Sequence, residues 1–170
     1  MMFLFTRKKS LFSRLVGWYL DEPTNHFVIY LDALEVVVHS NFKGVHVEDA
    51  ERFKKENTVN FMLAPKKQLS KDQQEKFLFE TVFKSYFNRP YDFGAFIFWP
   101  VKDFFEYIFK INYKHNLWSS KEGLLCTEFA ASIKNLSIKI DWPDNLEITT
   151  AYQLYLQMKK SPDLIEVTEI

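Results

Sequence analysis

The stretch NHFVIYLDALEVVVH, residues 25–39, decides the fold of this chain. Its two runs, residues 27–31 and 34–38, are rich in β-branched, aromatic and aliphatic side chains, a composition typical of strands. Asp32 and Ala33 lie between the runs and are the only plausible reversal. We therefore predict an antiparallel hairpin that is closed by a two-residue turn.

The register of this predicted hairpin places His26 directly opposite His39. Opposed residues in an antiparallel pair have Cβ atoms about 4.5–5.5 Å apart, so the two imidazoles would lie side by side. Asp-Ala is not one of the dipeptides that most strongly favour a tight hairpin turn. A slip of one residue in the register would move one histidine to the other face of the sheet. The alternative to a histidine pair is therefore that His26 and His39 are unrelated residues of two paired strands.

Length and composition limit the class of protein. The 170 residues suffice for one domain with a proper core, and 47% hydrophobic with 26% charged residues indicates a globular chain. The 22 basic and 22 acidic side chains balance, which argues against a dedicated nucleic-acid binder. The single cysteine, Cys126, excludes an intrachain disulfide framework and suits a reducing compartment.

The N-terminal segment does not resemble a secretory signal. Residues 1–5 are apolar but too few for the hydrophobic region of a signal peptide, and the basic residues 7–9 follow them instead of preceding them. No run approaches the roughly 18–20 apolar residues that span a bilayer. We expect a cytoplasmic protein.

Other elements follow from periodicity and capping signals. Ser10 and Ser70 are suited to N-cap positions, and Gln73 completes a capping box with Ser70. His46 is expected to face solvent from a short strand. We expect strands over residues 2–6, 45–47, 60–64 and 164–167, helices over 11–19, 71–86, 123–133 and 148–159, and a helical turn over 48–54.

The segment 95–111 is the most aromatic part of the chain, and Pro100 lies within it. A proline removes a backbone donor and clashes with the preceding turn, so we predict that this segment is not one clean helix. Two interpretations are open: a helical segment packed over the core, or an exposed apolar surface for a lipid or a partner.

Cys126 lies near the predicted start of a helix. The free N–H groups and the dipole of a helix start favour the thiolate, and a neighbouring imidazolium would lower the pKa of the thiol further. The same N–H groups would stabilise an oxyanion formed by attack on a carbonyl. The alternative is that this cysteine is a small buried hydrophobic residue.

The order of these residues resembles the circularly permuted papain-like hydrolases, namely the permuted NlpC-type peptidases and especially the YiiX-like group. Residues 25–31, NHFVIYL, are similar to the S-H-V-G-I-Y-L strand of that group. Residues 5–16, 90–93 (PYDF), 125–129 (LCTEF) and 143–146 (PDNL) resemble its opening strand and helix, P-Y-D, Y-C-S-E-L and P-x-D-L segments. The spacing of the histidines also resembles the lecithin:retinol acyltransferase relatives, which use the fold on lipid acyl groups.

This chain departs from the family pattern at three places. Asn25 stands where the family has serine, His39 stands where the third catalytic residue is often an acid, and residues 94–116 form an enlarged aromatic insertion. The first two departures leave the chemistry intact. The insertion would line or cover the groove, so the substrate class is left open.

The resemblance implies an α+β fold in which an antiparallel sheet packs against helices and the nucleophile lies at a helix N-terminus. It implies one hydrolase domain over residues 1–170. Cys126 would be the nucleophile, His26 the general base and His39 the residue that orients it, with Tyr91 and Asn25 as oxyanion or site-lining candidates. We expect neither a cofactor nor a metal.

Three functions follow as hypotheses from the residues and the resemblance together. The first is hydrolysis of an amide bond, in a peptide or a cell-wall peptide, through a thioester. The second is a lipid acyl hydrolase or acyltransferase, in which residues 96–109 contact a membrane or lipid. The third is a non-catalytic binding module. Nucleic acid is not an expected partner, and the oligomeric state is not predicted.

Overall fold

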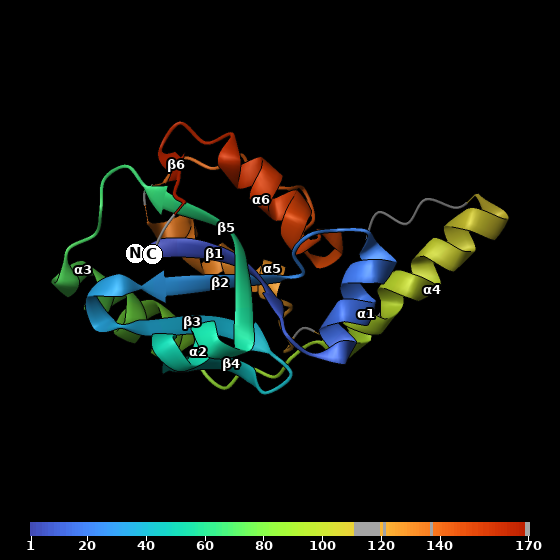
Figure 1. Ribbon diagram of the computed structural model, residues 1–170, viewed down its shortest axis with the longest axis horizontal. Coiled ribbons are helices and arrows are strands. Elements are labelled where there is room, and N and C mark those ends of the chain that lie inside the picture. The colour runs from blue at the N-terminus through green and yellow to red at the C-terminus, as the bar shows by residue number, and fades with distance from the viewer. Residues whose placement is uncertain (111–119, 121, 137, 169–170) are drawn as a thin grey trace.

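The sheet organises the molecule, which is described by a computed structural model over residues 1–110, 120, 122–136 and 138–168. Six strands pair antiparallel in the order β4-β3-β2-β1-β5-β6 (Figure 1). Their bounds are β1 Met2–Lys8, β2 His26–Leu31, β3 Val36–Asn41, β4 Gly44–Asp49, β5 Asn57–Pro65 and β6 Leu164–Glu166. The predicted α+β class with an antiparallel sheet is confirmed.

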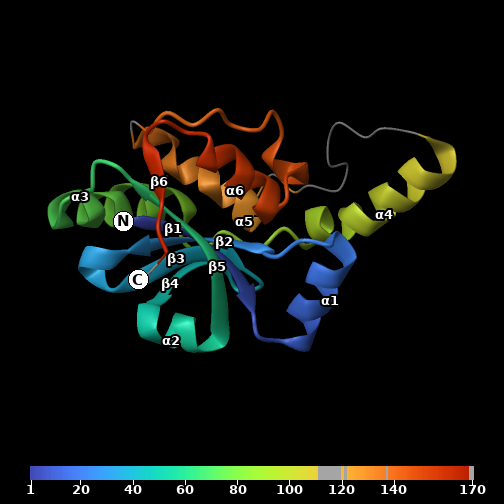
Figure 2. The same ribbon diagram turned by 45° about the horizontal axis from the view of Figure 1, so that its top comes forward.

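Helices cover both faces of this sheet. Figure 2 shows α5 and α6 on one side and α2 on the other, with α1 and α4 at one end. The bounds are α1 Leu11–Leu20, α2 Ala50–Glu56, α3 Lys71–Lys76, α4 Phe93–Phe109, α5 Cys126–Phe129 and α6 Ala151–Lys159. A π-helix, Phe77–Tyr86, continues α3, and 3-10 helices cover Asp32–Leu34, Ala130–Asn135 and Leu146–Ile148. Within the described ranges, no helix is long and apolar enough to cross a membrane.

The alternation of β2 separates two apolar cores. Phe27 and Ile29 point to the side of α5 and α6 and belong to a large cluster that includes Phe129. Val28 and Tyr30 point the other way and join a smaller cluster around Phe53 of α2. Successive side chains of a strand point to opposite faces, so these clusters define an α5–α6 face and an α2 face.

The hairpin turn differs from the prediction. The chain turns through the 3-10 helix Asp32–Leu34 and through Glu35, whose φ is 55°, and β2 then pairs with β3 from Ile29–Val38 to Leu31–Val36. The turn is thus two residues longer than predicted, and every partner shifts by two positions. Because the side-chain period of a strand is two, the shift leaves each residue on its predicted face.

Contacts of Asp32 explain why this longer turn forms. Its carboxylate accepts hydrogen bonds from the N-terminal ammonium of Met1 and from the Gln74 side-chain amide. These partners come from distant parts of the chain, so the local dipeptide signal did not contain them. Asp32 is consequently fixed by tertiary contacts and not by a primed two-residue turn.

The aromatic segment forms one helix, α4, which continues through Pro100 from Phe93 to Phe109. The prediction that this proline divides it was wrong, because a helix can continue after losing a single N–H donor. Phe98 is buried, but most large apolar residues of α4 are exposed: Phe93, Ile97, Phe104, Phe105, Tyr107, Ile108 and Phe109. Residues 111–116 of the expected insertion lie outside the described part.

Local capping signals were read correctly elsewhere. The Ser70 hydroxyl accepts the Gln73 N–H, and the Gln73 side chain accepts the Ser70 N–H, which confirms the predicted capping box. The segment expected as one helix over 123–133 differs, because α5 has only four residues and a 3-10 helix replaces its continuation. A helix of one turn carries little of the macrodipole that a long helix start would supply.

Candidate functional site

His26 and His39 lie together on the α2 face. His26 is the first residue of β2, and its Nε2 lies 2.7 Å from Nδ1 of His39 in β3. The ladder register makes them diagonal neighbours and not the directly opposed pair that we predicted. The short contact means that one nitrogen donates and the other accepts. It also leaves Nδ1 of His26 as the nitrogen that His39 does not engage.

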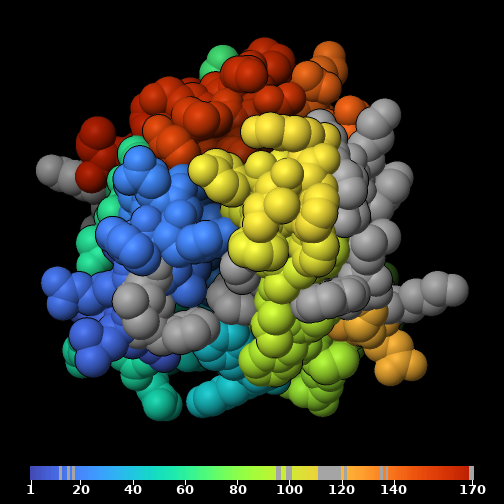
Figure 3. Space-filling view, turned by 90° about the vertical axis from the view of Figure 1, so that its right-hand side faces the viewer, coloured from blue at the N-terminus to red at the C-terminus, as the bar shows by residue number. Residues whose placement is uncertain are grey.

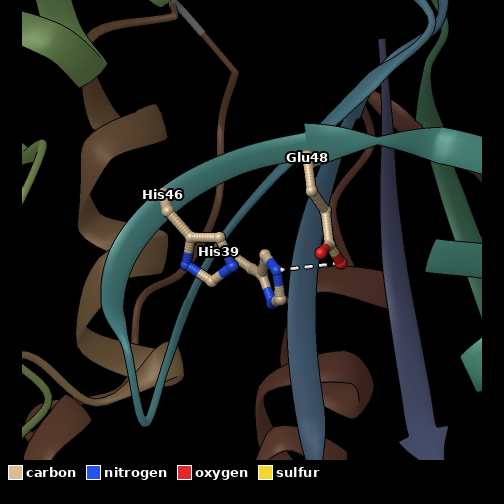
Figure 4. Close-up of side chains that lie close together, drawn as sticks. All are labelled: His39, His46 and Glu48. Atoms are coloured by element: carbon tan, nitrogen blue, oxygen red, sulfur yellow. Dashed lines mark ion pairs between the residues drawn. The ribbon is translucent and has the colours of Figure 1, made fainter. Parts of the chain in front are cut away.

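His46 and Glu48 extend this pair across the next strand. His39 lies directly opposite His46 in the β3–β4 ladder, with ring centroids 4.4 Å apart. Its Nε2 is 3.4 Å from Oε1 of Glu48 (Figure 4). We call these four residues, His26, His39, His46 and Glu48, the histidine cluster. The expectation that His46 faces solvent was wrong, because it is half-buried against His39.

The sequence contained a signal for the missed members. His46 and Glu48 are two residues apart, so on one strand they point to the same face. We assigned residue 48 to a helical turn, whereas β4 runs to Asp49 and α2 begins only at Ala50. Extending the strand by two residues would have placed both side chains beside His39.

All four residues of the cluster line a cavity of about 260 Å³. Lys8, Arg52, Glu56 and Asn57 form part of its wall, and Asn25 and Tyr91 also contribute. Burial, followed by the charges of its neighbours His39 and His46, holds the pKa of His26 well below 6.5. Burial also lowers the pKa of His39, although the Glu48 carboxylate opposes this shift. Both imidazoles are therefore neutral at pH 7.

Cys126 lies on the other side of the sheet from the cluster. It opens α5, is 7% exposed, and packs in the α5–α6 core with Phe27 and Phe129. The backbone N–H of Phe27 donates to its sulfur, which places the thiol beside the residue that follows His26. The structure thus pairs the two histidines closely and connects Cys126 to them through the β2 backbone.

The electrostatics of Cys126 reverse our expectation of a lowered thiol pKa. Burial raises the pKa to about 11, and the backbone donors of Phe27 and Thr127 offset only part of that shift. The four-residue α5 adds little dipole, and the neutral imidazoles of the histidine cluster supply no positive charge. The resting thiol is consequently protonated.

Tyr91 and Asn25 have different environments. Tyr91 forms an isolated bridge with Leu124, close to Cys126, and also lines the cavity. Burial and then the Cys126 charge raise its pKa well above 10, so its hydroxyl remains a donor. The Asn25 amide nitrogen donates to the Ser13 carbonyl at 2.9 Å, which ties the start of β2 to α1.

Comparisons with protein-family models, with curated proteins and with solved structures find no match for this chain. The resemblance to permuted papain-like hydrolases therefore stays a prediction.

Proposed function

We propose that the protein is a cysteine hydrolase with a permuted papain-like fold, which cleaves an amide bond of a peptide or cell-wall peptide through a thioester. One observation carries the proposal: the 2.7 Å contact between His26 Nε2 and His39 Nδ1. It fixes the imidazole and leaves Nδ1 to accept a proton. The Phe27 N–H supports the same assignment, because it donates to the Cys126 sulfur from the residue that follows His26 in β2.

The neutral resting state favours general-base catalysis over a preformed ion pair. The scheme requires the Cys126 thiol and the His26 ring to meet at the start of β2. There His26 Nδ1 takes the thiol proton as the Cys126 sulfur attacks the substrate carbonyl. The tetrahedral intermediate then expels the amine, which receives that proton, and leaves a thioester on Cys126. Water attacks the thioester with His26 again as base, releasing the acid and restoring the thiol.

His39 is a positioning residue in this scheme. His26 must carry its resting proton on Nε2, which it donates to His39 Nδ1, so that Nδ1 of His26 is free to act as base. His39 is then protonated on Nε2, the atom that faces the Glu48 carboxylate at 3.4 Å. The carboxylate stabilises the positive charge that develops on the two rings during proton transfer.

The oxyanion donors follow from the same surroundings. The Cys126 backbone N–H is one donor, and the Tyr91 hydroxyl is the second, because its raised pKa keeps it protonated. The Asn25 amide already donates to Ser13, so we assign Asn25 to holding the start of β2.

Trapping of the acyl-enzyme tests the proposal. We expect an activated acyl donor, such as a p-nitrophenyl ester, to add one acyl group to the native protein, located on Cys126 by peptide mass spectrometry. Because the chain has a single cysteine, Cys126→Ser identifies the site without ambiguity. His26→Ala should slow acylation by roughly 10²–10⁴-fold, the usual contribution of a positioned base.

The positioning role of His39 needs a separate comparison. His39→Asn should retain much more activity than His39→Ala, because an amide can still accept the His26 Nε2–H. Glu51→Gln on the outer side of α2 serves as the matched surface control, since Glu51 is exposed and pairs only with its neighbour Lys54 among the described residues. Acylation that persists in Cys126→Ser, or that is indifferent to His26→Ala in folded protein, would contradict the proposal.

The exposed aromatic residues of α4 favour a second candidate, a lipid acyl hydrolase or acyltransferase with the same site residues. Phe104 and Phe109 are more than half exposed, whereas apolar side chains of this size are usually buried. The chemistry at Cys126 would be unchanged, and the acyl group would come from a lipid. Acylation by a phospholipid but not by a peptide substrate would select this candidate.

A specific observation also favours a non-catalytic binding module. Cys126 is protonated and packs in the core on the opposite face from the histidine cluster. The cavity would then bind a ligand through the cluster alone. Failure of every acyl donor to modify folded protein would support this function and exclude the two hydrolase candidates.

A further inference from the structure

We propose that His39, His46 and Glu48 bind one divalent transition-metal ion, for which Zn²⁺ is the reference. One ligand atom from each side chain lies within 4.8 Å of the others. Figure 4 shows the two rings and the carboxylate gathered on adjacent strands. Two imidazoles and one carboxylate are a ligand set that binds zinc with one coordination position left open.

His39 provides the observation that points to an ion. Its side chain is buried, with the residue 3% exposed, and Nε2 has no hydrogen-bond partner among the described residues. The Glu48 oxygen at 3.4 Å lies within ion-pair range but is not aligned as a hydrogen bond. A buried nitrogen without a partner destabilises the fold, and an ion that takes its lone pair removes this cost.

The second ring nitrogen of each histidine is already engaged. Nδ1 of His46 lies 3.0 Å from the Gly44 carbonyl oxygen, which can only accept, so this nitrogen carries the proton. Nε2 of His46 then presents its lone pair, which the Asn41 side-chain amide approaches at 3.5 Å and which a metal ion would take over. Nδ1 of His39 is held by Nε2 of His26. Metal-bound histidines typically donate their other N–H to a carbonyl or a comparable acceptor, which fixes the ring orientation.

The spacing and the surrounding charge fit a small ion after a modest closure. Tetrahedral zinc with bonds of about 2.0–2.1 Å holds its ligand atoms about 3.3 Å apart, and His39 and Glu48 are already at 3.4 Å. Two cations of the cavity wall, Lys8 and Arg52, both pair with Glu56, at 3.5 and 3.9 Å. Glu48 is 27% exposed, so its side chain has room to move toward the ion.

Direct binding tests this site without any assay of activity. Protein freed of metal by a chelator is titrated with Zn²⁺ by calorimetry, and separately with Co²⁺, whose visible absorption reports the coordination geometry. We expect one ion per chain and a tetrahedral-type cobalt spectrum. His46→Ala and Glu48→Gln should each weaken Zn²⁺ binding by at least about 10–100-fold. That range is typical for loss of a residue that only hydrogen-bonds a metal ligand, and these two residues are themselves ligands.

Two variants serve as controls. Glu51→Gln makes the same charge change on neighbouring α2, where the side chain is 75% exposed, and Cys126→Ser removes the thiol. Both should bind as the unmodified protein does. Equal affinity in all variants would overturn the proposal, as would a site lost in Cys126→Ser but kept in Glu48→Gln. If His46→Ala does not fold, Zn²⁺ binding by Glu48→Gln tests the proposal, because Glu48 is partly exposed and its substitution should not disturb the fold.

Discussion

His39 has two ring nitrogens, and the two proposals use them in opposite protonation states. Catalysis requires the proton on Nε2, facing Glu48, so that Nδ1 accepts from His26. A metal ion on Nε2 moves the proton to Nδ1, which then donates to His26 Nε2 at the observed 2.7 Å. His26 must in turn carry its own proton on Nδ1, the nitrogen that would have accepted the thiol proton.

Zinc should therefore slow the acylation of Cys126 without coordinating its sulfur. We expect saturating Zn²⁺ to lower the acylation rate of the unmodified protein by at least about tenfold, measured by intact mass, because the competent tautomer is lost. In His46→Ala the ratio of rates without and with zinc should approach one. A ratio unchanged by His46→Ala would place the inhibitory ion on the thiol instead.

The pH dependence of Cys126 alkylation separates the neutral pair from an ion pair. With a pKa of about 11, the thiolate fraction rises about tenfold per pH unit up to pH 10. The rate of iodoacetamide labelling should follow this slope, measured by intact mass between pH 6 and 10. A plateau beginning below pH 8 would indicate a preformed thiolate–imidazolium pair. His26→Ala should leave the slope unchanged if the resting pair is neutral.

The strand pattern of residues 25–39 correctly predicted that His26 and His39 lie together. The predicted register was wrong by two residues, but such an error leaves both side chains on the same face of the sheet. It did not predict the pKa of Cys126, since burial depends on packing against Phe27 and Phe129 from distant segments. His46 was missed through an error of two residues in where a strand ends. A contact that requires only that two strand side chains share a face can be predicted despite a two-residue error. A pKa that depends on burial by distant segments cannot.

At the scale of elements, α5 depends on the half-buried carboxyl of Glu128. Oε2 of Glu128 accepts the Leu125 N–H at 2.7 Å, at the N-terminus of the helix that carries Cys126. Burial, together with the charges of Glu147 and Asp92, raises the pKa of Glu128 to about 7. The folded state thus holds a proton on this group more tightly than the unfolded chain does.

Stability should consequently fall as pH rises. A raised carboxyl pKa contributes stability that is complete below the unfolded pKa, near 4.5, and lost as pH rises through about 7. For this half-buried group the loss is about 1–2 kcal/mol after discounting for solvent screening. The free energy of unfolding in urea, compared between pH 5 and pH 7.5, measures this loss of stability.

Glu128→Gln is the matched control, because it keeps an oxygen for the Leu125 N–H and does not titrate. The difference in unfolding free energy between the unmodified protein and this variant should narrow or change sign toward low pH, as the carboxyl of the unmodified protein becomes protonated. A difference that is constant from pH 5 to 7.5 would show that Glu128 titrates near its ordinary value.

Elements with local signals were predictable, and those set by distant contacts were not. The Ser70 capping box needs only three neighbouring residues and was found from sequence. The turn after β2 is fixed by Asp32 contacts with Met1 and Gln74, which lie 31 and 42 residues away. The periodicity of residues 123–133 likewise did not indicate that α5 ends after four residues.

At the scale of the whole molecule, the antiparallel sheet was predicted because strand alternation is strong and repeated. The direction of α4 was not, since an apolar helix with Pro100 is equally consistent with burial over the core. Figure 3 shows α4 beside α1 at one end, and the Tyr19 hydroxyl donates to Asp103 between them. Leu11 and Trp18 of α1 are also exposed.

The exposed apolar surface of α4 is the feature that would distinguish a lipid substrate from a peptide. The charged residues of α4 are Lys102, Asp103 and Glu106, and Lys102 pairs with Glu106 at 3.1 Å. Their net charge of −1 means that attraction to acidic lipid contributes little. Association with phosphatidylcholine vesicles would then depend on apolar burial. We expect the unmodified protein to co-sediment with such vesicles, and Phe104→Glu to weaken this by at least about tenfold, since burying one phenylalanine is worth about 1.5–3 kcal/mol.

Phe79→Glu is the matched control, because Phe79 is 59% exposed and Phe104 is 58% exposed, yet Phe79 lies on the π-helix away from α4. If both variants bind vesicles as the unmodified protein does, or if none binds, the α4 surface does not contact lipid. A concentration-dependent dimer in sedimentation velocity that Phe104→Glu abolishes would instead mean that a second copy covers α4. Vesicle binding lost only in Phe104→Glu would place the acyl source in a bilayer, because the same end of the molecule would then carry both membrane contact and the start of β2.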